Sequence, residues 1–410
     1  MNRVRILPSA LSGELTVPLS KSAAHRAVIC SALAGEKRIL PPGETLSDDL
    51  LATQNAVAKL ADIKEEPLVL DCRESGSTLR FLIPVAAALG RTVTFTGHGR
   101  LPERPIGVYL GCLPQHGVCC ETAGGLPLTI SGDLTPGVFS LPGNVSSQFV
   151  SGLLLALPLL GGNSRIVLTS PLESASYVDM TIRIMRAFGV TAESTENGWF
   201  VAGRQQYRPA PGFQIERDWS QAAFFLAAGM LGGPVQIRGL EPYSCQGDRA
   251  AEDLFRRFGT ELSWENGILT ARAGVCPESV PDIDASQIPD LVPILAAGAA
   301  LLPGVRTVIR HAERLRLKES DRLSAIANGL NRLGAHIAEL PDGLEIFGKK
   351  ALRGGTAEGC GDHRIVMALA VAALRSEGET VITDAQSIRK SYPDFFRDYN
   401  RLGGKAYDMG

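Results

Sequence analysis

The sequence has 410 residues and a mass of 43.6 kDa, which is too long for one small domain and enough for two with large apolar cores. Its net charge of −2 argues against a protein that binds nucleic acid through a strongly basic surface. Its eight cysteines form no CxxC pair and no zinc-like cluster, so we expect reduced thiols and neither disulfides nor a metal site.

The first residues contain no apolar signal core, because Pro8 and Gly13 follow the charged start at once. The apolar runs further along, such as residues 150–160, are too short to span a membrane. We therefore expect a cytoplasmic protein without a membrane partner.

One segment type recurs along the whole chain: an Ala/Leu-rich helix, a glycine that ends it, and a β-branched strand. The helices are expected at residues 23–34, 78–89, 148–160, 221–231, 291–303 and 363–377. The strands after them are expected at residues 38–40, 92–95, 166–168, 235–237, 307–309 and 381–382. A second helix and a short hairpin, with turns such as 196–198 and 341–343, complete each period. Each period therefore reads strand–helix–strand–helix–strand–strand.

Six such units predict an α/β protein with two domains of three units each. A polar, proline-rich stretch at residues 205–214 separates the third unit from the fourth. We therefore expect one domain at residues 19–216 and the other at residues 217–410. Residues 1–18 are assigned to the second domain, because they supply a strand that the repeats leave over.

Cations lie beside ordinary capping residues at several helix starts. Lys21 and Arg26 follow the cap Ser20. Arg80 and Arg364 lie near the starts of later repeated helices. Serine, aspartate and glycine are common caps on structural grounds alone, but the helix dipole disfavours a cation at this end. An anion bound between the cation and the helix would explain the pairing, so these helix starts are candidates for a strongly anionic ligand.

Further cations lie in a stiff loop and in dense charge runs. Arg104 is flanked by prolines, and Lys390 is one of only nine lysines. Residues 314–322 form the densest charge run, and a helix there would place Lys318 and Arg322 on one face with Glu319 near Arg322. Most charge runs are solvated helix faces, so both interpretations stay open at this point.

Nine short motifs in order make the chain resemble the 5-enolpyruvylshikimate-3-phosphate synthase family over essentially its whole length. They lie at residues 18–26, 75–80, 103–107, 146–148, 177–180, 288–290, 317–322, 361–364 and 390–394. The resemblance implies an inside-out α/β barrel fold of two domains, each with three βαβαββ units, and a substrate site in the interdomain cleft. It also implies transfer of the enolpyruvyl group of phosphoenolpyruvate to the 5-hydroxyl of shikimate 3-phosphate, with loss of phosphate, on the pathway to chorismate and the aromatic amino acids.

The resemblance further implies which residues contact each substrate. Shikimate 3-phosphate would be bound by Lys21, Ser22, Arg26, Ser146, Ser147, Gln148, Ser174, Tyr177, Asp290 and Lys318. Phosphoenolpyruvate would be bound by Lys21, Gly76, Arg104, Gln148, Arg322, His363, Arg364 and Lys390. Asp290 is the expected base and Glu319 the expected acid, with Lys21 as the alternative acid. No metal or cofactor is implied, a monomer is expected, and glyphosate is a candidate inhibitor.

The sequence departs from the common family pattern near several of these motifs. His25 replaces a polar residue of the first motif and is expected to be structural. Glu74 stands where many members have Asn, Phe81 where many have Pro, and Arg314 where well-known members have Asn. These changes leave the expected chemistry intact and the sensitivity to glyphosate open.

Two other functions stay open on the sequence alone. UDP-N-acetylglucosamine enolpyruvyl transferase shares the fold and the donor, but it typically has Asn where Ser22 stands and a cysteine in the loop that here reads Pro102-Glu103-Arg104. A non-catalytic repeat protein that binds anionic metabolites or RNA is the other alternative. The net charge and the 6% aromatic content argue against it, so we expect no nucleic-acid partner.

Overall fold

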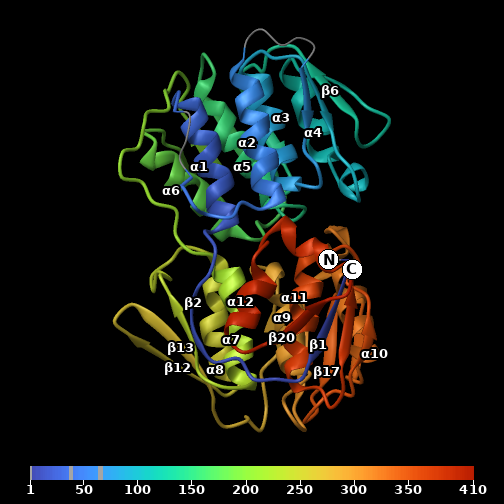
Figure 1. The fold of residues 1–410 in the computed structure, drawn as a ribbon. Coiled ribbons are helices and arrows are strands. Elements are labelled where there is room, and N and C mark those ends of the chain that lie inside the picture. Colours follow the sequence, from blue (N-terminus) through green and yellow to red (C-terminus); the bar gives the residue numbers. More distant parts are fainter. Residues whose placement is uncertain (1, 37–39, 63–67) are drawn as a thin grey trace. The chain divides into compact units, whose positions relative to one another are not determined.

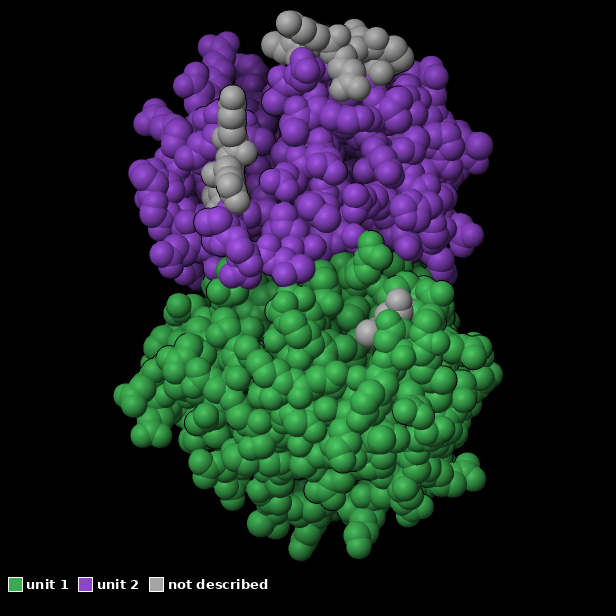
Figure 2. Space-filling model, in the orientation of Figure 1, with its two compact units in different colours: residues 1–19, 216–410 green, residues 20–215 purple. Residues whose placement is uncertain are grey.

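The computed structural model describes residues 2–36, 40–62 and 68–410 (Figure 1). The chain divides into two compact units, which Figure 2 colours separately. Unit 1 comprises Met1–Leu19 and Glu216–Gly410, and unit 2 comprises Ser20–Ile215. The chain therefore begins in unit 1, builds all of unit 2, and then returns to complete unit 1.

The described residues form five four-stranded sheets that share one topology. In each sheet one pair of neighbouring strands at one edge is parallel, and the two other pairs are antiparallel. One sheet of unit 2 has the strand order β3 (Leu68–Asp71), β4 (Val93–Thr96), β6 (Leu128–Ser131), β5 (Cys119–Glu121). The other sheet of unit 2 has the order β7 (Val138–Leu141), β8 (Ser164–Leu168), β10 (Gly198–Val201), β9 (Glu193–Thr195). In unit 1 the first sheet has the strand order β12 (Thr260–Glu265), β13 (Ile268–Ala273), β11 (Val235–Arg238), β2 (Gly13–Thr16). The second has the order β14 (Ile283–Asp284), β15 (Arg306–Arg310), β17 (Gly343–Phe347), β16 (Ile337–Leu340). The third has the order β18 (Gly355–Ala357), β19 (Thr380–Thr383), β1 (Arg3–Leu7), β20 (Lys405–Asp408).

The first two strands of the chain complete two sheets of unit 1. β1 pairs antiparallel with β19, with Val4 opposite Ile382, and β2 pairs parallel with β11. Val4 and Ile6 are fully buried, while Arg3 and Arg5, which alternate with them, are exposed. This alternation gives β1 one face toward the core and one toward solvent, as the twofold period of a strand requires.

Buried helices form the core of each unit. Unit 2 contains α1 (Lys21–Leu33), α2 (Asp48–Ala61), α3 (Gly76–Ala88), α4 (Gly107–Cys112), α5 (Ser147–Ala156) and α6 (Ala175–Ala187). Unit 1 contains α7 (Trp219–Leu231), α8 (Ala251–Arg257), α9 (Val292–Ala299), α10 (Arg322–Arg332), α11 (His363–Ala372) and α12 (Phe395–Arg401). In unit 1, α7, α9 and α11 pack against one another, and every residue of all three helices is buried. A helix buried on all sides is a core element, so the sheets cover the helices rather than the reverse.

The α/β prediction is confirmed, and the expected helices and strands agree with the structure in the part of the chain that it describes. Most of the strand expected at residues 38–40 lies outside the described residues. The helix considered for residues 314–322 is wrong. A short 3₁₀ helix (Glu313–Leu317) ends at Lys318, which is extended, and α10 begins only at Arg322, because Asp321 caps it by accepting a hydrogen bond from Ser324 N at 3.2 Å. Lys318 and Arg322 therefore do not share a helix face.

Gly152 on α5 allows a close approach to α3 and α4. A Cβ atom there would lie 2.3 Å from Tyr109 Oη and 2.4 Å from the backbone oxygen of Arg80. We expect Gly152→Ala to lower the free energy of unfolding by about 2 kcal/mol, measured by urea denaturation, because the buried neighbours must move. Gly111→Ala on α4 is the matched control, since nothing lies within 4 Å of its Cβ position. Equal stability of the two variants would contradict this account of the α3–α5 packing.

Candidate active site

Lys21 is held at the first position of α1 by the helix cap and by an ion pair. Ser20 Oγ accepts a hydrogen bond from Ala23 N at 3.4 Å, so the helix begins at Lys21. Lys21 Nζ donates to Asp49 Oδ2 of α2 at 2.8 Å. The Lys21 side chain is 16% exposed, so its ammonium group is positioned by Asp49 and still accessible to a ligand.

Arg26 is buried one turn further along α1 and directs its donors at protein groups. Its Nε donates to Thr181 Oγ1 at 2.6 Å, and its Nη1 donates to the backbone oxygen of Ser22 at 2.7 Å. Its Nη2 donates to the backbone oxygen of Tyr177 at 3.0 Å and to Ser151 Oγ at 3.2 Å. Arg26 therefore ties α1 to α5 and α6, and it orients two further predicted site residues, Ser22 and Tyr177.

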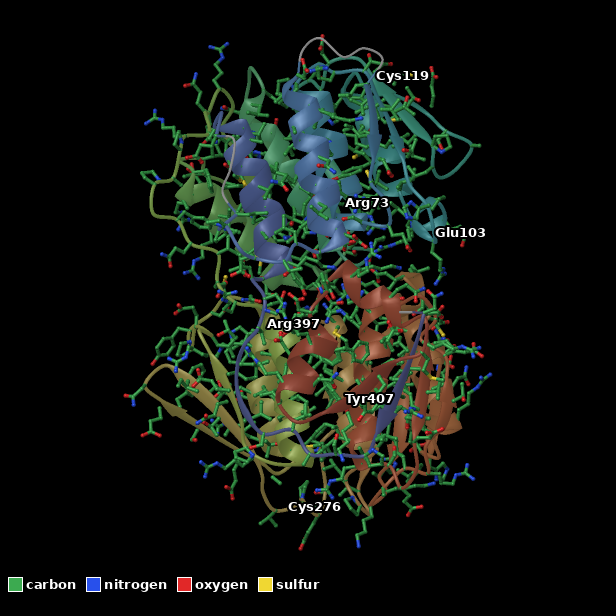
Figure 3. All side chains as sticks on the ribbon, viewed as in Figure 1. Arg73, Glu103, Cys119, Cys276, Arg397 and Tyr407 are labelled. Atoms are coloured by element: carbon green, nitrogen blue, oxygen red, sulfur yellow. The ribbon has the colours of Figure 1, made fainter. Side chains whose placement is uncertain are left out.

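The start of α3 carries Gly76 against a buried arginine. Ser75 caps α3, and a Cβ atom on Gly76 would lie 2.8 Å from Arg104 Nη1. A larger residue at this place would require the Arg104 guanidinium to shift. Arg73 and Glu103, labelled in Figure 3, lie shortly before these residues in the chain. Arg104 is buried, so its charge is held at the helix N-terminus, where an anion would be favoured.

The start of α5 is joined to α3 by Gln148. Ser146 caps α5, and Ser147 is its first residue. Gln148 Oε1 accepts from Arg80 Nη1 at 2.7 Å, while Gln148 Nε2 donates to Ser77 Oγ at 2.9 Å. These bonds bring the predicted residues of α3 and α5 together.

Ser174 precedes the first residue of α6 and has a left-handed backbone conformation, with φ of 54°. The side chain of Ser174 is buried, and Tyr177 lies within the first turn of the helix that follows. The structure therefore places both residues at one helix start. With Lys21, Ser22, Arg26, Gly76, Arg104, Ser146, Ser147 and Gln148, they form the unit 2 set of predicted site residues.

Arg322 organises the corresponding set in unit 1. It is 1% exposed, and its guanidinium contacts three carboxylates from three segments. Its Nη1 lies 2.8 Å from Asp290 Oδ1, its Nη2 lies 2.7 Å from Glu319 Oε2, and its Nε lies 2.8 Å from Asp362 Oδ2. The expected proximity of Glu319 to Arg322 is thus present, although it arises at a helix start and not along a helix.

Asp290 lies between two arginines, in the middle of a short 3₁₀ helix (Pro289–Leu291). Besides Arg322, it contacts Arg364 through Oδ2 at 3.1 Å and through its backbone oxygen at 3.0 Å. Burial raises the pKa of Asp290, but the positive charges of Arg364, Lys318 and Arg322 outweigh burial and hold that pKa well below its ordinary value. Asp290 is therefore a carboxylate at neutral pH.

Three further predicted residues border this network. Burial lowers the pKa of Lys318 to about 8, against the opposing attraction of Asp290. Lys390, at the end of a 3₁₀ helix (Ala385–Lys390), donates from Nζ to the backbone oxygen of Gly361 at 2.7 Å. His363 is buried at the first position of α11, with Nδ1 3.8 Å from Asp362 Oδ1. The cations Lys318, Arg322 and Arg364 thus lie close to the carboxylates of Asp290, Glu319 and Asp362.

Several hydrogen-bond and ion-pair partners of these residues were not predicted from the sequence. Asp49 pairs with Lys21, and Asp362 pairs with Arg322, but neither had an assigned role. Asp248 is buried and accepts a hydrogen bond from Ser220 at the start of α7, and burial raises its pKa to about 7. Asp362 could have been found as the acidic cap before His363. Asp248 and Asp49 have no such local signal, because their partners lie on other helices.

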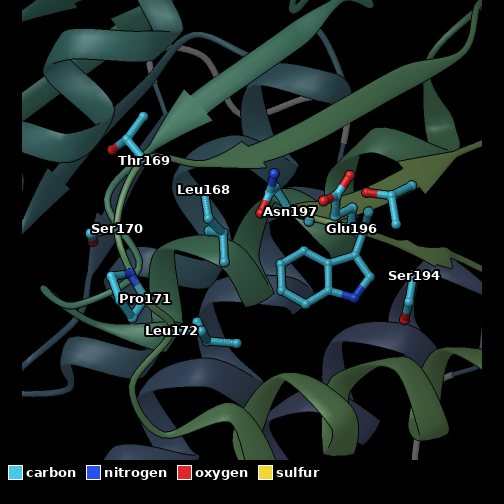
Figure 4. Close-up of a pocket in the computed structure, with 11 residues that line it drawn as sticks. Leu168, Thr169, Ser170, Pro171, Leu172, Ser194, Glu196 and Asn197 are labelled. Carbon is cyan, nitrogen blue, oxygen red and sulfur yellow. The ribbon is translucent and has the colours of Figure 1, made fainter.

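A surface pocket in unit 2 lies apart from the predicted site residues. It is lined by residues 168–172 after β8 and residues 194–199 of the β9–β10 hairpin. Figure 4 shows Pro171 and Leu172 on the loop side, and Glu196 and Asn197 on the hairpin side. Across the described ranges, no group of three or more His, Cys, Asp or Glu residues could hold a metal ion. None of the helices in those ranges is both long and apolar enough to cross a membrane.

Comparison with known proteins relates the chain to one enzyme family. The profile of EPSP synthase (3-phosphoshikimate 1-carboxyvinyltransferase) matches residues 7–399. Proteins named 3-phosphoshikimate 1-carboxyvinyltransferase are similar in sequence: that of Clostridium acetobutylicum is 42% identical over 100% of this chain and 99% of its own, and that of Clostridium novyi is 40% identical over 98% of both.

Solved structures are similar to this chain along its length. EPSP synthase from Acinetobacter baumannii has a TM-score of 0.78 and 25% identity, with full coverage of both chains. The enolpyruvyl transferase NikO from Streptomyces tendae shares the fold, with a TM-score of 0.76 and 18% identity over 99% of this chain and 98% of its own.

The buried Arg322–Asp362 pair should contribute far more to stability than an exposed pair of equal length. We expect Asp362→Asn to lower the free energy of unfolding by about 3 kcal/mol, because it leaves a buried guanidinium short of one counter-charge. Glu358→Gln is the control: Glu358 pairs with Arg332 at 2.8 Å, but both side chains are more than half exposed. That change should alter stability by less than about 1 kcal/mol. Urea denaturation of both variants checks the difference, and similar losses would contradict it.

Proposed function

The chain belongs to the EPSP synthase (3-phosphoshikimate 1-carboxyvinyltransferase) family, and from that premise we propose how its own residues perform the family's reaction. The enzyme transfers the enolpyruvyl group of phosphoenolpyruvate to the 5-hydroxyl of shikimate 3-phosphate and releases phosphate, a step of aromatic amino acid biosynthesis. The observation that carries the proposal is the buried network of unit 1, in which Asp290 is ionised between Arg322 and Arg364.

The substrates explain why cations are concentrated in the predicted residues. Together they bring two phosphates and two carboxylates, and like charges can lie side by side only when fixed cations neutralise them. In unit 2 we propose that Lys21 and Arg104 bind phosphoenolpyruvate, while Ser146 and Ser147 hold the 3-phosphate at the start of α5. In unit 1 the proposed ligands are Lys318, Arg364 and Lys390. The reaction requires both sets to act on one pair of substrates.

We assign Asp290 as the base for the 5-hydroxyl. It is ionised, as a base must be, but the positive charges of Arg364 and Lys318 lower its pKa and make it a weak base. When substrate anions pair with those two cations, their pull on Asp290 weakens and its pKa rises. Substrate binding thereby prepares Asp290 to accept the hydroxyl proton.

We assign Glu319 as the acid for the methylene carbon, with Lys21 as the alternative. An added substrate anion favours the protonated form of a nearby carboxyl group such as Glu319. The 5-hydroxyl oxygen then bonds to C2 of phosphoenolpyruvate, its proton passes to Asp290, and Glu319 protonates C3. In the second step Glu319 takes a proton back from C3 while the bond from C2 to the phosphate oxygen breaks, which restores the double bond. Asp290 returns its proton to the departing phosphate.

We further propose that the enzyme acts as a cytoplasmic monomer without a nucleic-acid partner and that glyphosate inhibits it. All eight cysteines are unpaired, which supports a reducing compartment. The net charge of −2 supports the absence of a nucleic-acid partner. Arg104, which we propose binds phosphoenolpyruvate, lies against Gly76, and glyphosate as another small anion would compete for this cation.

Phosphate release from phosphoenolpyruvate plus shikimate 3-phosphate tests the function directly. We expect the folded protein to release phosphate only when both substrates are present. Lys21→Ala should lower the turnover rate by at least about 100-fold, because a charge placed for the transition state is lost. Lys59→Ala is the control, since Lys59 lies exposed on α2 and donates to the backbone oxygen of Val69. Near-normal turnover by Lys21→Ala would contradict the assignment, and no release by the wild type would contradict the function.

Lys318 should give the affinity for shikimate 3-phosphate a pH dependence. Its pKa of about 8 means that it is charged below pH 8 and loses its charge above it. The KM for shikimate 3-phosphate should therefore rise above pH 8, by up to about tenfold per pH unit. In Lys318→Arg the rise should disappear, because arginine stays charged throughout this range. Steady-state kinetics from pH 6.5 to about 9.5 measures both profiles, and parallel profiles would exclude Lys318 as the titrating group.

A further inference from the structure

Four buried polar side chains form a hydrogen-bonded chain beneath the start of α3, which we call the His25 chain. His25 Nδ1 lies 2.7 Å from Thr53 Oγ1, and Thr53 Oγ1 lies 2.6 Å from Thr78 Oγ1. Thr78 Oγ1 donates to Ser75 Oγ at 2.7 Å. All four residues are at most 1% exposed, so water does not compete for these bonds.

The His25 chain connects three helices at the ends that carry predicted site residues. His25 lies one turn after Lys21 on α1, and Thr53 lies one turn after Asp49 on α2. Ser75 and Thr78 flank Gly76 at the start of α3. The His25 chain thus links α1, which carries Lys21, to α3, which carries Gly76. The helix α2 carries both Thr53 and Asp49 and contacts α1 and α3.

The order of donors along the chain fixes the proton on His25. Because Thr78 donates its hydroxyl hydrogen to Ser75, its oxygen can only accept a hydrogen bond from Thr53. Thr53 then has no hydrogen left for His25, so His25 Nδ1 must be the donor to Thr53 Oγ1. The imidazole is therefore the neutral Nδ1–H tautomer, and Nε2 is left as a buried acceptor. Burial, with the charges of Lys21 and Arg26, lowers the pKa of His25 well below its ordinary value, which agrees with a neutral ring.

A buried histidine at this position is not the side chain that stability alone would favour. His25 Nε2 has no hydrogen-bond partner among the residues that the structure describes, and a buried polar atom without a partner is unfavourable. The ring otherwise lies edge-on to Phe81, with the ring centroids 6.5 Å apart, in surroundings that would accept an apolar side chain. Unlike an apolar residue, His25 supplies a hydrogen-bond donor, which holds Thr53 in place and, through Thr53, the start of α3.

We propose that His25 is a positioning residue that sets the place of Gly76 and Arg104 relative to Lys21 and so determines how tightly phosphoenolpyruvate binds. The link to Arg104 is direct, because its guanidinium lies where a Cβ on Gly76 would be only 2.8 Å from Nη1. The inference rests on the proposed function, which gives these three residues their ligand. It goes beyond the structural role expected for His25 from its place in the first motif.

Steady-state kinetics with His25→Leu, His25→Asn and Thr53→Val tests the proposal. We expect the KM for phosphoenolpyruvate to rise about tenfold in His25→Leu and Thr53→Val, because the anchor is lost and the helix starts move apart. The KM for shikimate 3-phosphate and kcat should stay within about threefold. His25→Asn should restore the KM toward the wild-type value, since its side-chain amide can donate from nearly the same place as Nδ1.

Thr94→Val is the matched control, because it also removes one hydroxyl from a threonine pair in unit 2. Thr94 Oγ1 lies 2.9 Å from Thr129 Oγ1 between β4 and β6, away from the helix starts. We expect no change in the KM for phosphoenolpyruvate in this variant. If His25→Leu does not fold, Thr53→Val decides, since it removes the same link with a side chain of similar size.

Nitrogen-15 NMR of the imidazole gives a second, independent test that does not require turnover. The Nδ1–H tautomer supports the direction of the chain, and the Nε2–H tautomer would overturn it. An unchanged KM for phosphoenolpyruvate in both His25→Leu and Thr53→Val would also overturn the proposal. A uniform loss of kcat and of both affinities, in step with lost stability, would reduce His25 to a structural residue. Failure of the proposed function is separable, because the wild type would then release no phosphate whatever the tautomer of His25.

Discussion

The burial of the Arg322 guanidinium is the constraint on which the unit 1 site depends. A buried charge is tolerated only when counter-charges and hydrogen bonds replace the lost water. Asp290, Glu319 and Asp362 supply them from three segments that are distant in the sequence. The ion pairs of Arg322 therefore hold three segments in place together: the 3₁₀ helix before α9, the turn before α10 and the cap of α11. The position of the proposed base follows from this electrostatic requirement more than from apolar packing.

Unit 2 positions its residues by a different means, with close contacts and mostly uncharged hydrogen bonds. Gly76 admits the Arg104 guanidinium at a helix start, and Gln148 joins α5 to α3 through Arg80 and Ser77. Such contacts hold the geometry of the helix starts. We propose that the unit 2 cations Lys21 and Arg104 bind anions, whereas the unit 1 network moves a proton when an anion arrives.

The sequence predicts the repeated elements well because their signals are local. A glycine after an Ala/Leu-rich stretch and a β-branched run after it need no knowledge of the rest of the fold. The sequence also predicts that Glu319 lies near Arg322, but it gives the wrong local structure, because Asp321 acts as a cap and delays α10. The pairs Lys21–Asp49 and Ser220–Asp248 are each 28 residues apart on separate helices. No periodicity links such residues, so only the packed structure reveals them.

The strands β1 and β2 give the chain an order of assembly. Unit 2 is one continuous segment, so its residues can meet as soon as they leave the ribosome. Unit 1 cannot close its sheets then, because β1 needs β19 and β20, and β2 needs β11. The first strands must wait with unpaired backbone edges while more than half of the protein is made. An exposed strand edge is a site of wrong pairing. Arg3 and Arg5, which alternate with Val4 and Ile6 along β1, place charge on that strand, and charged side chains on an edge strand disfavour wrong pairing.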